Sequence, residues 1–161
     1  MAEPRRAAGA KKRSFKGTRI LIVEARFYDD IADALLEGAT RALDAVGASY
    51  DRISVPGSLE IPPTIAIALG SPDRKRVPYD AAVGLGCVIR GETLHFEIVS
   101  FESARALMDL SVSRRIPIGN GIITVDTDAQ ARERADVKRG DKGGDAARAA
   151  LALLQINNRR R

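Results

Sequence analysis

Few residues in this sequence could support a disulfide framework, a cysteine-bound metal or an aromatic binding platform. Among 161 residues there is one cysteine, Cys87, and one histidine, His95, and aromatic side chains make up 4% of the chain. A lone cysteine has no partner for an intrachain disulfide or a metal cluster, and a place inside an apolar run is typical of a small core residue. We therefore expect no metal site, and we expect the reducing environment of the cytoplasm.

Long hydrophobic runs are also missing. No apolar stretch has the uncharged length that spans a bilayer, and the basic N-terminus lacks the apolar centre of a secretion signal. A length of 161 residues with 45% hydrophobic side chains instead fits one globular domain with a core of its own. The sequence predicts a cytoplasmic protein with no membrane partner.

The excess of positive charge lies at the two ends of the chain. Residues 1–17 carry six Lys or Arg against Glu3, and residues 159–161 are three arginines, so the ends contribute +8 to the net charge of +5 and the body carries 5 − 8 = −3. A body without a cationic face, with tails that lack interleaved aromatics, does not fit the pattern that binds phosphate backbones. We expect no nucleic-acid partner, and we divide the chain into a basic mobile N-terminal arm (1–17), a folded domain (18–158) and a basic C-terminal tail (159–161).

Apolar strand-like runs alternate with helix-like segments along the folded domain. Strands are predicted over 19–25, 50–55, 83–90 and 118–125. Helices are predicted from a cap at Asp29 or Asp30 to Gly47, over 58–69, over 96–115, from a cap at Thr127 or Asp128 to Ala135, and through Ala147, Ala150, Leu151 and Leu154. Connections of this length make parallel crossovers. The predicted fold is therefore α/β, a three-layer α/β/α sandwich with a central four-stranded parallel sheet, flavodoxin-like.

The third predicted helix and the strand after it are unusually apolar for a monomer. Helical spacing predicts that the apolar residues of this helix face the sheet, namely Ile98, Phe101, Ala104, Leu107, Met108 and Val112. The apolar content of the two elements together indicates packing between subunits.

In parallel sheets ligands bind at the carboxyl ends of the strands, so the residues that follow the predicted strands are site candidates. These are the segments 26–28, 56–58 and 90–95, with Asn120 or beyond in the fourth strand. A nucleotide motif does not explain them, because the pair Gly84-x-Gly86 lacks a third glycine and lies inside a strand, and no Walker sequence occurs. One cleft of another kind is the expectation.

Four side chains in or next to these loops can each be explained either by a role in binding or catalysis or by a purely structural role. The ring of Phe27, directly after the first strand, could stack on a flat ligand or cover the core. Histidine is the residue type whose ordinary pKa suits proton transfer near neutrality, but His95 could equally be a surface or helix-capping residue. Ser58 and Glu60 stand where helix-capping residues are favoured.

Five segments together resemble the 6,7-dimethyl-8-ribityllumazine synthase family. They read ARF over 25–27, VPGSLEIP over 55–62, GCVIRGETLHF over 86–96, QAxxRA over 130–135 and DKG over 141–143. The third segment is the most specific, because it occurs where a strand passes into a loop. The resemblance extends from about residue 19 to residue 154.

The resemblance implies a transferase that uses two small-molecule substrates and neither a cofactor nor a metal. It would condense 5-amino-6-(D-ribitylamino)uracil with 3,4-dihydroxy-2-butanone 4-phosphate to the lumazine, phosphate and water, the penultimate step of riboflavin biosynthesis. His95 would be the catalytic residue that moves protons. The implied contacts to the pyrimidine and its ribityl chain are Phe27, Gly57, Ser58, Leu59, Glu60, Val88, Ile89, Asn120 and Lys142, and the phosphate site is Gly91, Glu92, Thr93 and Arg134.

Two features of the implied phosphate site agree with elementary chemistry. The segment 91–93 precedes a predicted helix, where backbone N–H groups and the helix dipole favour an anion. The planar guanidinium of Arg134 suits phosphate oxygens, although an arginine on an amphipathic helix is usually solvated. Members of the family form ring pentamers with each active site between neighbours, and some build icosahedral shells of pentamers. A homopentamer is therefore expected, with the shell as an alternative.

Two positions depart from the family pattern. Tyr28 stands where asparagine is common, and Asn120 stands where a phenylalanine commonly reaches into the neighbouring subunit's pocket. These departures leave a second hypothesis open, a flavin- or lumazine-binding protein of the same fold with little turnover. A flavodoxin-like regulator fits less well, because the first strand ends in Glu24-Ala25-Arg26 rather than in a phosphoacceptor.

Overall fold

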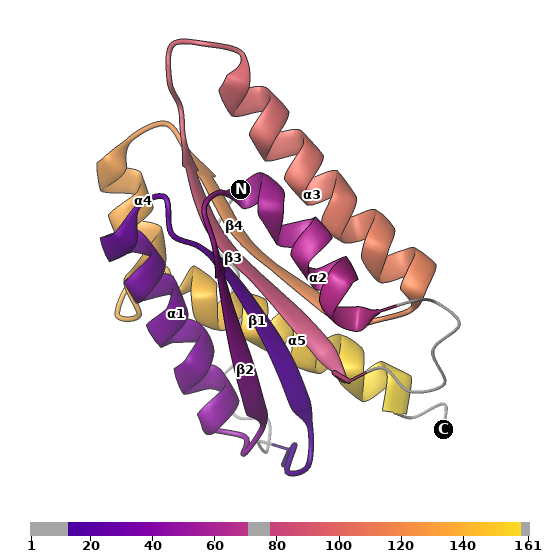
Figure 1. The fold of residues 1–161 in the computed structure, drawn as a ribbon. Coiled ribbons are helices and arrows are strands. Elements are labelled where there is room, and N and C mark those ends of the chain that lie inside the picture. Colours follow the sequence, from indigo (N-terminus) through magenta and orange to yellow (C-terminus); the bar gives the residue numbers. More distant parts are fainter. Residues whose placement is uncertain (1–12, 71–77, 159–161) are drawn as a thin grey trace.

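A four-stranded parallel sheet is the centre of the computed structural model, which describes residues 13–70 and 78–158 (Figure 1). Its strands are β1 (Arg19–Ala25), β2 (Ser49–Val55), β3 (Ala81–Ile89) and β4 (Ile118–Val125), in the order β2-β1-β3-β4. All three neighbouring pairs are parallel. Every residue of β3 except Ile89 is buried, as an unbroken apolar run in a strand covered on both faces requires.

Helices cover both faces of this sheet, which confirms the predicted three-layer α/β/α class (Figure 1). One face packs on α1 (Asp29–Asp44), α4 (Asp128–Ala135) and α5 (Lys142–Asn158). The other packs on α2 (Ile61–Leu69), which follows the 3-10 turn η1 (Ser58–Glu60), and on α3 (His95–Arg114). Each face has its own apolar core cluster, and both clusters draw on the central strands β1 and β3.

The two predicted helix caps have different outcomes. Thr127 caps α4 as expected, because its side chain accepts a hydrogen bond from the Gln130 amide at 3.2 Å. The prediction that Asp29 or Asp30 caps α1 is wrong: Tyr28 is the N-cap residue and makes no side-chain cap hydrogen bond. Both aspartates lie inside the first turn, where their charge still complements the helix dipole.

The predicted orientation of α3 is also wrong for most of its large side chains. Toward the sheet the helix buries Ser100, Ser103 and Leu107, and the small serines allow close packing on the strands. The opposite side exposes Leu94, Ile98, Phe101, Met108 and Val112, which we call the α3 stripe. Most of the large apolar side chains of this helix gather on the side away from the sheet, whereas the sheet side is largely small and polar, so the spacing of apolar residues indicated the wrong side.

The folded body begins slightly before Thr18, where the sequence placed its boundary. Phe15 packs against the α1 side of the core, and its amide donates to the Val46 carbonyl at 2.8 Å. Residues 1–12 of the predicted arm, the predicted tail and most of the connection after Gly70 lie outside the described residues. Within the described ranges no helix is long and apolar enough to cross a membrane.

Candidate active site

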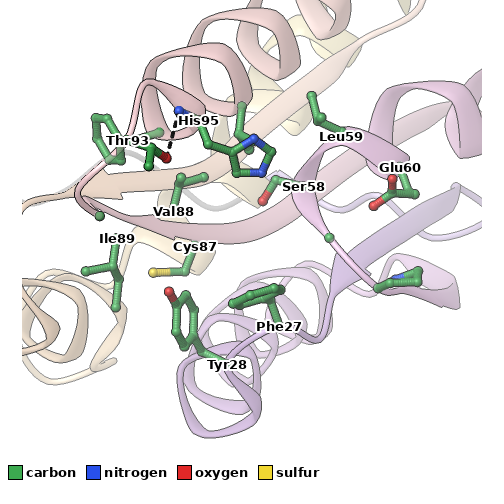
Figure 2. A pocket seen from close by; sticks show the side chains of 15 residues that line it. Phe27, Tyr28, Ser58, Leu59, Glu60, Cys87, Val88, Ile89, Thr93 and His95 are labelled. Carbon is green, nitrogen blue, oxygen red and sulfur yellow. Dashed lines mark hydrogen bonds between the residues drawn. The ribbon is translucent and has the colours of Figure 1, made fainter.

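A cavity of about 420 Å³ lies at the carboxyl ends of β1, β2 and β3 (Figure 2). Three connections form its walls: the β1–α1 turn, the β2–η1 turn with η1 itself, and the end of β3 with the loop that leads into α3. Its lining residues are Phe27, Tyr28, Pro56, Gly57, Ser58, Leu59, Glu60, Cys87, Val88, Ile89, Gly91, Thr93, His95, Phe96 and Val99. The segments 26–28, 56–58 and 90–95 therefore share one cleft, as predicted from their places at the carboxyl ends of parallel strands.

The β1–α1 turn contributes an aromatic wall. Phe27 and Tyr28 pack edge to face with ring centroids 5.0 Å apart. Phe27 is 71% exposed, so its ring does not cover the core. Between the two interpretations of this residue, the exposed ring favours a surface on which a flat ligand can stack.

The β2–η1 turn contributes polar groups on the other side of the cavity. Ser58 is buried, and its hydroxyl packs against β3 at Gly86, where a Cβ atom would come within 2.6 Å of Ser58 Oγ. The glycine pair in β3 is thus explained by close packing, since a Cβ on Gly84 would also crowd Ile61. The Glu60 carboxylate lies back toward Gly57, 2.9 Å from the position of a Cβ there.

The end of β3 and the following loop bring Thr93 and His95 over the cavity (Figure 2). His95 is the first residue of α3, and its amide donates to Thr93 Oγ1 at 3.4 Å. Arg90 anchors the loop at its base, because its guanidinium contacts Glu97 at 2.6 Å and Asp126 at 2.8 Å. The imidazole faces Phe27 and Tyr28 across the cavity.

Two of the predicted site residues on this side of the fold lie outside the cavity lining. Glu92 is exposed in the loop between its lining neighbours Gly91 and Thr93. Asn120 is exposed on the edge strand β4 opposite Gly84, well before the part of β3 that lines the cavity. The structure therefore does not bring Asn120 together with the other predicted contacts.

The two predicted cations also lie apart from the cavity lining. Arg134 is exposed on α4, and its NH1 donates to the carbonyl of Gln130 in the same helix at 3.3 Å. Lys142 begins α5 and pairs with Asp145 at 3.2 Å. None of the described residues that line the cavity is a lysine or an arginine, so one chain alone offers a phosphate no cationic side chain there.

The ionisable side chains of the lining are Glu60, His95, Tyr28 and Cys87. Tyr28 directs its hydroxyl toward the Cys87 sulfur (Figure 2), and burial, together with the nearby Cys87 and Asp128, raises the pKa of the phenol. Among the residues that the structure describes, no group of three or more His, Cys, Asp or Glu is arranged to hold a metal ion. The cavity thus combines an aromatic wall, buried and backbone polar groups and one imidazole.

Sequence reasoning missed several lining residues. Phe96 and Val99 lie one residue and one helical turn after His95, so helical periodicity could have found them. Cys87 was assigned to the core, and it is indeed 8% exposed, but it also lines the cavity because β3 extends beyond Leu85, the last residue that pairs with β1.

Comparison with known proteins gives the same assignment as the motifs. The family model described as 6,7-dimethyl-8-ribityllumazine synthase matches residues 17–158. This chain belongs to that family. Curated relatives with this name include one from Nitrobacter hamburgensis, 64% identical over 99% of this chain and 98% of the relative, and one from Rhodopseudomonas palustris, 63% identical with the same coverage. A Rhizobium meliloti relative is 60% identical over 89% of this chain and 94% of its own length.

Membership in the lumazine synthase family confirms the resemblance seen in the five sequence segments. Three of the segments supply the cavity, since 25–27, 55–62 and 86–96 contain all the lining residues except Tyr28 and Val99. The other two segments, 130–135 and 141–143, carry Arg134 and Lys142 and lie elsewhere on the surface of the same chain.

The Cys87 thiol gives a direct test of the cavity's environment. Burial, reinforced by Asp128 and Asp30, raises the pKa of Cys87 to about 12. A higher pKa leaves less thiolate at a given pH, and the thiolate is the reactive form. We expect alkylation of the native protein by iodoacetamide to remain slow from pH 7 to pH 9, whereas the urea-unfolded chain reacts as an ordinary thiol. A native thiol that titrates near pH 8.5 would contradict this environment.

Proposed function

We propose that this chain catalyses the condensation of 5-amino-6-(D-ribitylamino)uracil with 3,4-dihydroxy-2-butanone 4-phosphate to 6,7-dimethyl-8-ribityllumazine in riboflavin biosynthesis. The observation that carries the proposal is the cavity in which an exposed aromatic ring, the polar β2–η1 turn and the His95 imidazole face one another. The near full-length similarity to proteins of that name supports the same reaction. We also place the enzyme in the cytoplasm, because its lone Cys87 is a free thiol.

The aromatic wall and the β2–η1 turn would bind the pyrimidine substrate. Its flat ring would stack on Phe27, and backbone groups of Val88 and Ile89 at the end of β3 would meet its edge. The residues 57–60, with the Glu60 carboxylate and the Ser58 hydroxyl, would hold the ribityl hydroxyls, which are both donors and acceptors. These assignments use lining residues that already lie on opposite sides of one cavity.

The phosphate-bearing substrate would lie at the start of α3. Gly91, Glu92 and Thr93 would present backbone N–H groups there, and the helix dipole favours an anion at this end. A cation is still needed, and the described lining has none. We propose that Arg134 of a second copy completes the phosphate site, with Lys142 and Asn120 also reaching the pocket from that copy. All three lie outside the lining of their own cavity, where Arg134 and Asn120 are exposed and Lys142 is half-buried.

His95 would move protons during imine formation, loss of phosphate and ring closure. Each step transfers a proton to or from nitrogen or oxygen, and histidine takes up and releases protons near neutral pH. The imidazole lines the cavity opposite Phe27, where the reacting atoms of the stacked pyrimidine would lie. The alternative assignment of His95 as a helix cap is not favoured, since His95 is the first residue of α3 and Leu94 is its N-cap residue.

We propose that the oligomer is a ring pentamer, because the shared site needs a neighbouring copy and the resemblance to the family implies five. The α3 stripe points away from its own sheet, and five large apolar side chains exposed on one helix side are typical of an interface. A stripe that contacts a different surface of the next copy gives a head-to-tail interface, which closes into a ring. Such a ring would bring the exposed Arg134 of one copy to the cavity of its neighbour.

Turnover separates the proposed reaction from a binding protein of the same fold. We expect the purified protein to form lumazine and release phosphate from the two substrates. His95→Ala should lower kcat by about 100-fold, a typical contribution of general acid–base catalysis, while the affinity for the pyrimidine substrate largely remains. Binding of the pyrimidine without any release of phosphate by the wild type would support the flavin- or lumazine-binding alternative instead.

Light scattering during gel filtration tests the oligomer. The expected mass is five times the 17.3 kDa of the chain, and Phe101→Glu should dissociate the assembly because it places a charge in the α3 stripe. Ile67→Glu is the matched control, since Ile67 is equally apolar and 79% exposed but lies on α2 outside the stripe. A monomeric wild type would contradict the shared site, and a mass twelve times the pentamer would indicate the shell.

A further inference from the structure

Glu24 is a buried carboxylate that the proposed chemistry does not use. It lies on β1 and is 0% exposed, and it does not line the cavity. On the neighbouring strands it is in register with Ser54 of β2 and Leu85 of β3, on the sheet face that α1 covers. A charge in this position is costly unless it is paired and hydrogen-bonded.

The partners of Glu24 come from two different walls of the cavity. Ser54 Oγ donates to Glu24 Oε1 at 2.8 Å, and Arg52 Nε lies 3.4 Å from the same oxygen. Both residues belong to β2, whose next residues after Val55 form the β2–η1 turn. The other oxygen, Oε2, lies 3.4 Å from NH1 of Arg26 in the β1–α1 turn.

Arg26 extends this pairing to helix α1. Its Nε contacts Asp29 Oδ1 at 2.8 Å and its NH1 contacts Asp33 Oδ1 at 2.8 Å. The backbone amide of Arg26 also donates to the carbonyl of Val55, the last residue of β2, at 2.9 Å. We call Glu24, Arg26, Asp29 and Asp33 the Arg26 clasp, because one guanidinium joins the end of β1 to the first two turns of α1.

The clasp fixes the short segment that carries the aromatic wall. Phe27 and Tyr28 lie between Arg26 and Asp29, that is, between two members of the clasp. Packing alone holds Phe27 weakly, since its side chain is 71% exposed, and Tyr28 makes no side-chain cap hydrogen bond at the start of α1. Backbone hydrogen bonds from the Arg26 amide to Val55 and from the Ala32 amide to Tyr28, at 2.9 Å each, hold the main chain of this turn, and the ion pairs of Arg26 add its directional side-chain contacts.

We propose that Arg26 and Glu24 are positioning residues that hold the Phe27 ring in the orientation that stacks on the pyrimidine substrate. The inference rests on the proposed function, since it takes the pyrimidine as the flat ligand of that wall. Arginine suits this role because its rigid planar fork can engage several carboxylates in fixed directions. Without the clasp the turn would still be present, but the ring would sample other orientations and lose stacking energy.

A double-mutant cycle separates positioning from general stability. Arg26→Met should raise KM for the pyrimidine substrate about 2- to 10-fold, the range that an aromatic contact represents, with little change in KM for the phosphate-bearing substrate. In the Phe27→Ala background the same substitution should cause no further rise. Arg41→Met is the matched control, because Arg41 pairs with Glu37 at 3.5 Å on the same helix but at its far end, and it should leave both constants unchanged.

Two further variants keep the test decisive if Arg26→Met does not fold. Arg26→Lys retains the positive charge without the planar guanidinium, and Glu24→Gln retains the shape of the side chain without its charge. Each should raise KM for the pyrimidine substrate less than Arg26→Met does, and only when Phe27 is present. Equal rises in both KM values, or the same rise in the Phe27→Ala background, would show a merely structural role and overturn the proposal. Wild-type turnover in the same assay reports on the proposed function separately. If the wild type does not turn over, equilibrium binding of the pyrimidine substrate to these variants tests the positioning role of Arg26 and Glu24 instead. A Phe27-dependent loss of affinity would support that role, and unchanged affinity would overturn it.

Discussion

Burial of β3 on both faces is the constraint on which the rest of this structure depends. Its side chains alternate between the core beneath α1 and α5 and the core beneath α2, so neither face can be given up without exposing a continuous apolar run. Gly84 and Gly86 let Ile61 and Ser58 approach the strand closely, and this brings the β2–η1 turn to its carboxyl end. The chain leaves the sheet after Ile89, and the polar loop to His95 therefore opens beside the two other turns.

The resulting cavity is complete for one substrate and incomplete for the other. An exposed Phe27 ring opposite polar turn residues suits a flat heterocycle with a hydroxylated chain, whereas an anion finds helix N–H groups but no cationic side chain among the described lining residues. The same chain displays Arg134 on the exposed surface of α4, outside the cavity lining, and a stripe of large apolar side chains on α3. A neighbouring copy of the chain would explain both features, because it would supply the missing cation and cover the exposed apolar stripe.

Local sequence patterns predict much of the fold. Where the prediction was wrong, the cause is physical. β1 and β4 begin and end where predicted, because runs such as Ile20–Val23 have no alternative amphipathic arrangement as helices. The side of α3 that meets the sheet was predicted wrongly, because the large apolar side chains lie on the exposed side and the sheet packs on small serines instead. For the site, the rule that ligands bind at the carboxyl ends of parallel strands correctly joined three loops. No spacing in the sequence could reveal that Asn120, Arg134 and Lys142 lie apart from them.

Subunit complementation tests the shared site most directly. Chains carrying His95→Ala and chains carrying Arg134→Ala would be co-expressed with different tags, purified as mixed oligomers and assayed at limiting phosphate-bearing substrate. If each site takes its imidazole from one copy and its arginine from the next, random assembly restores both groups in roughly a quarter of the sites, as expected for a head-to-tail ring. The account predicts that the mixed oligomers recover about that share of wild-type turnover, although each variant alone is nearly inactive. Mixed oligomers no more active than the single variants would contradict it.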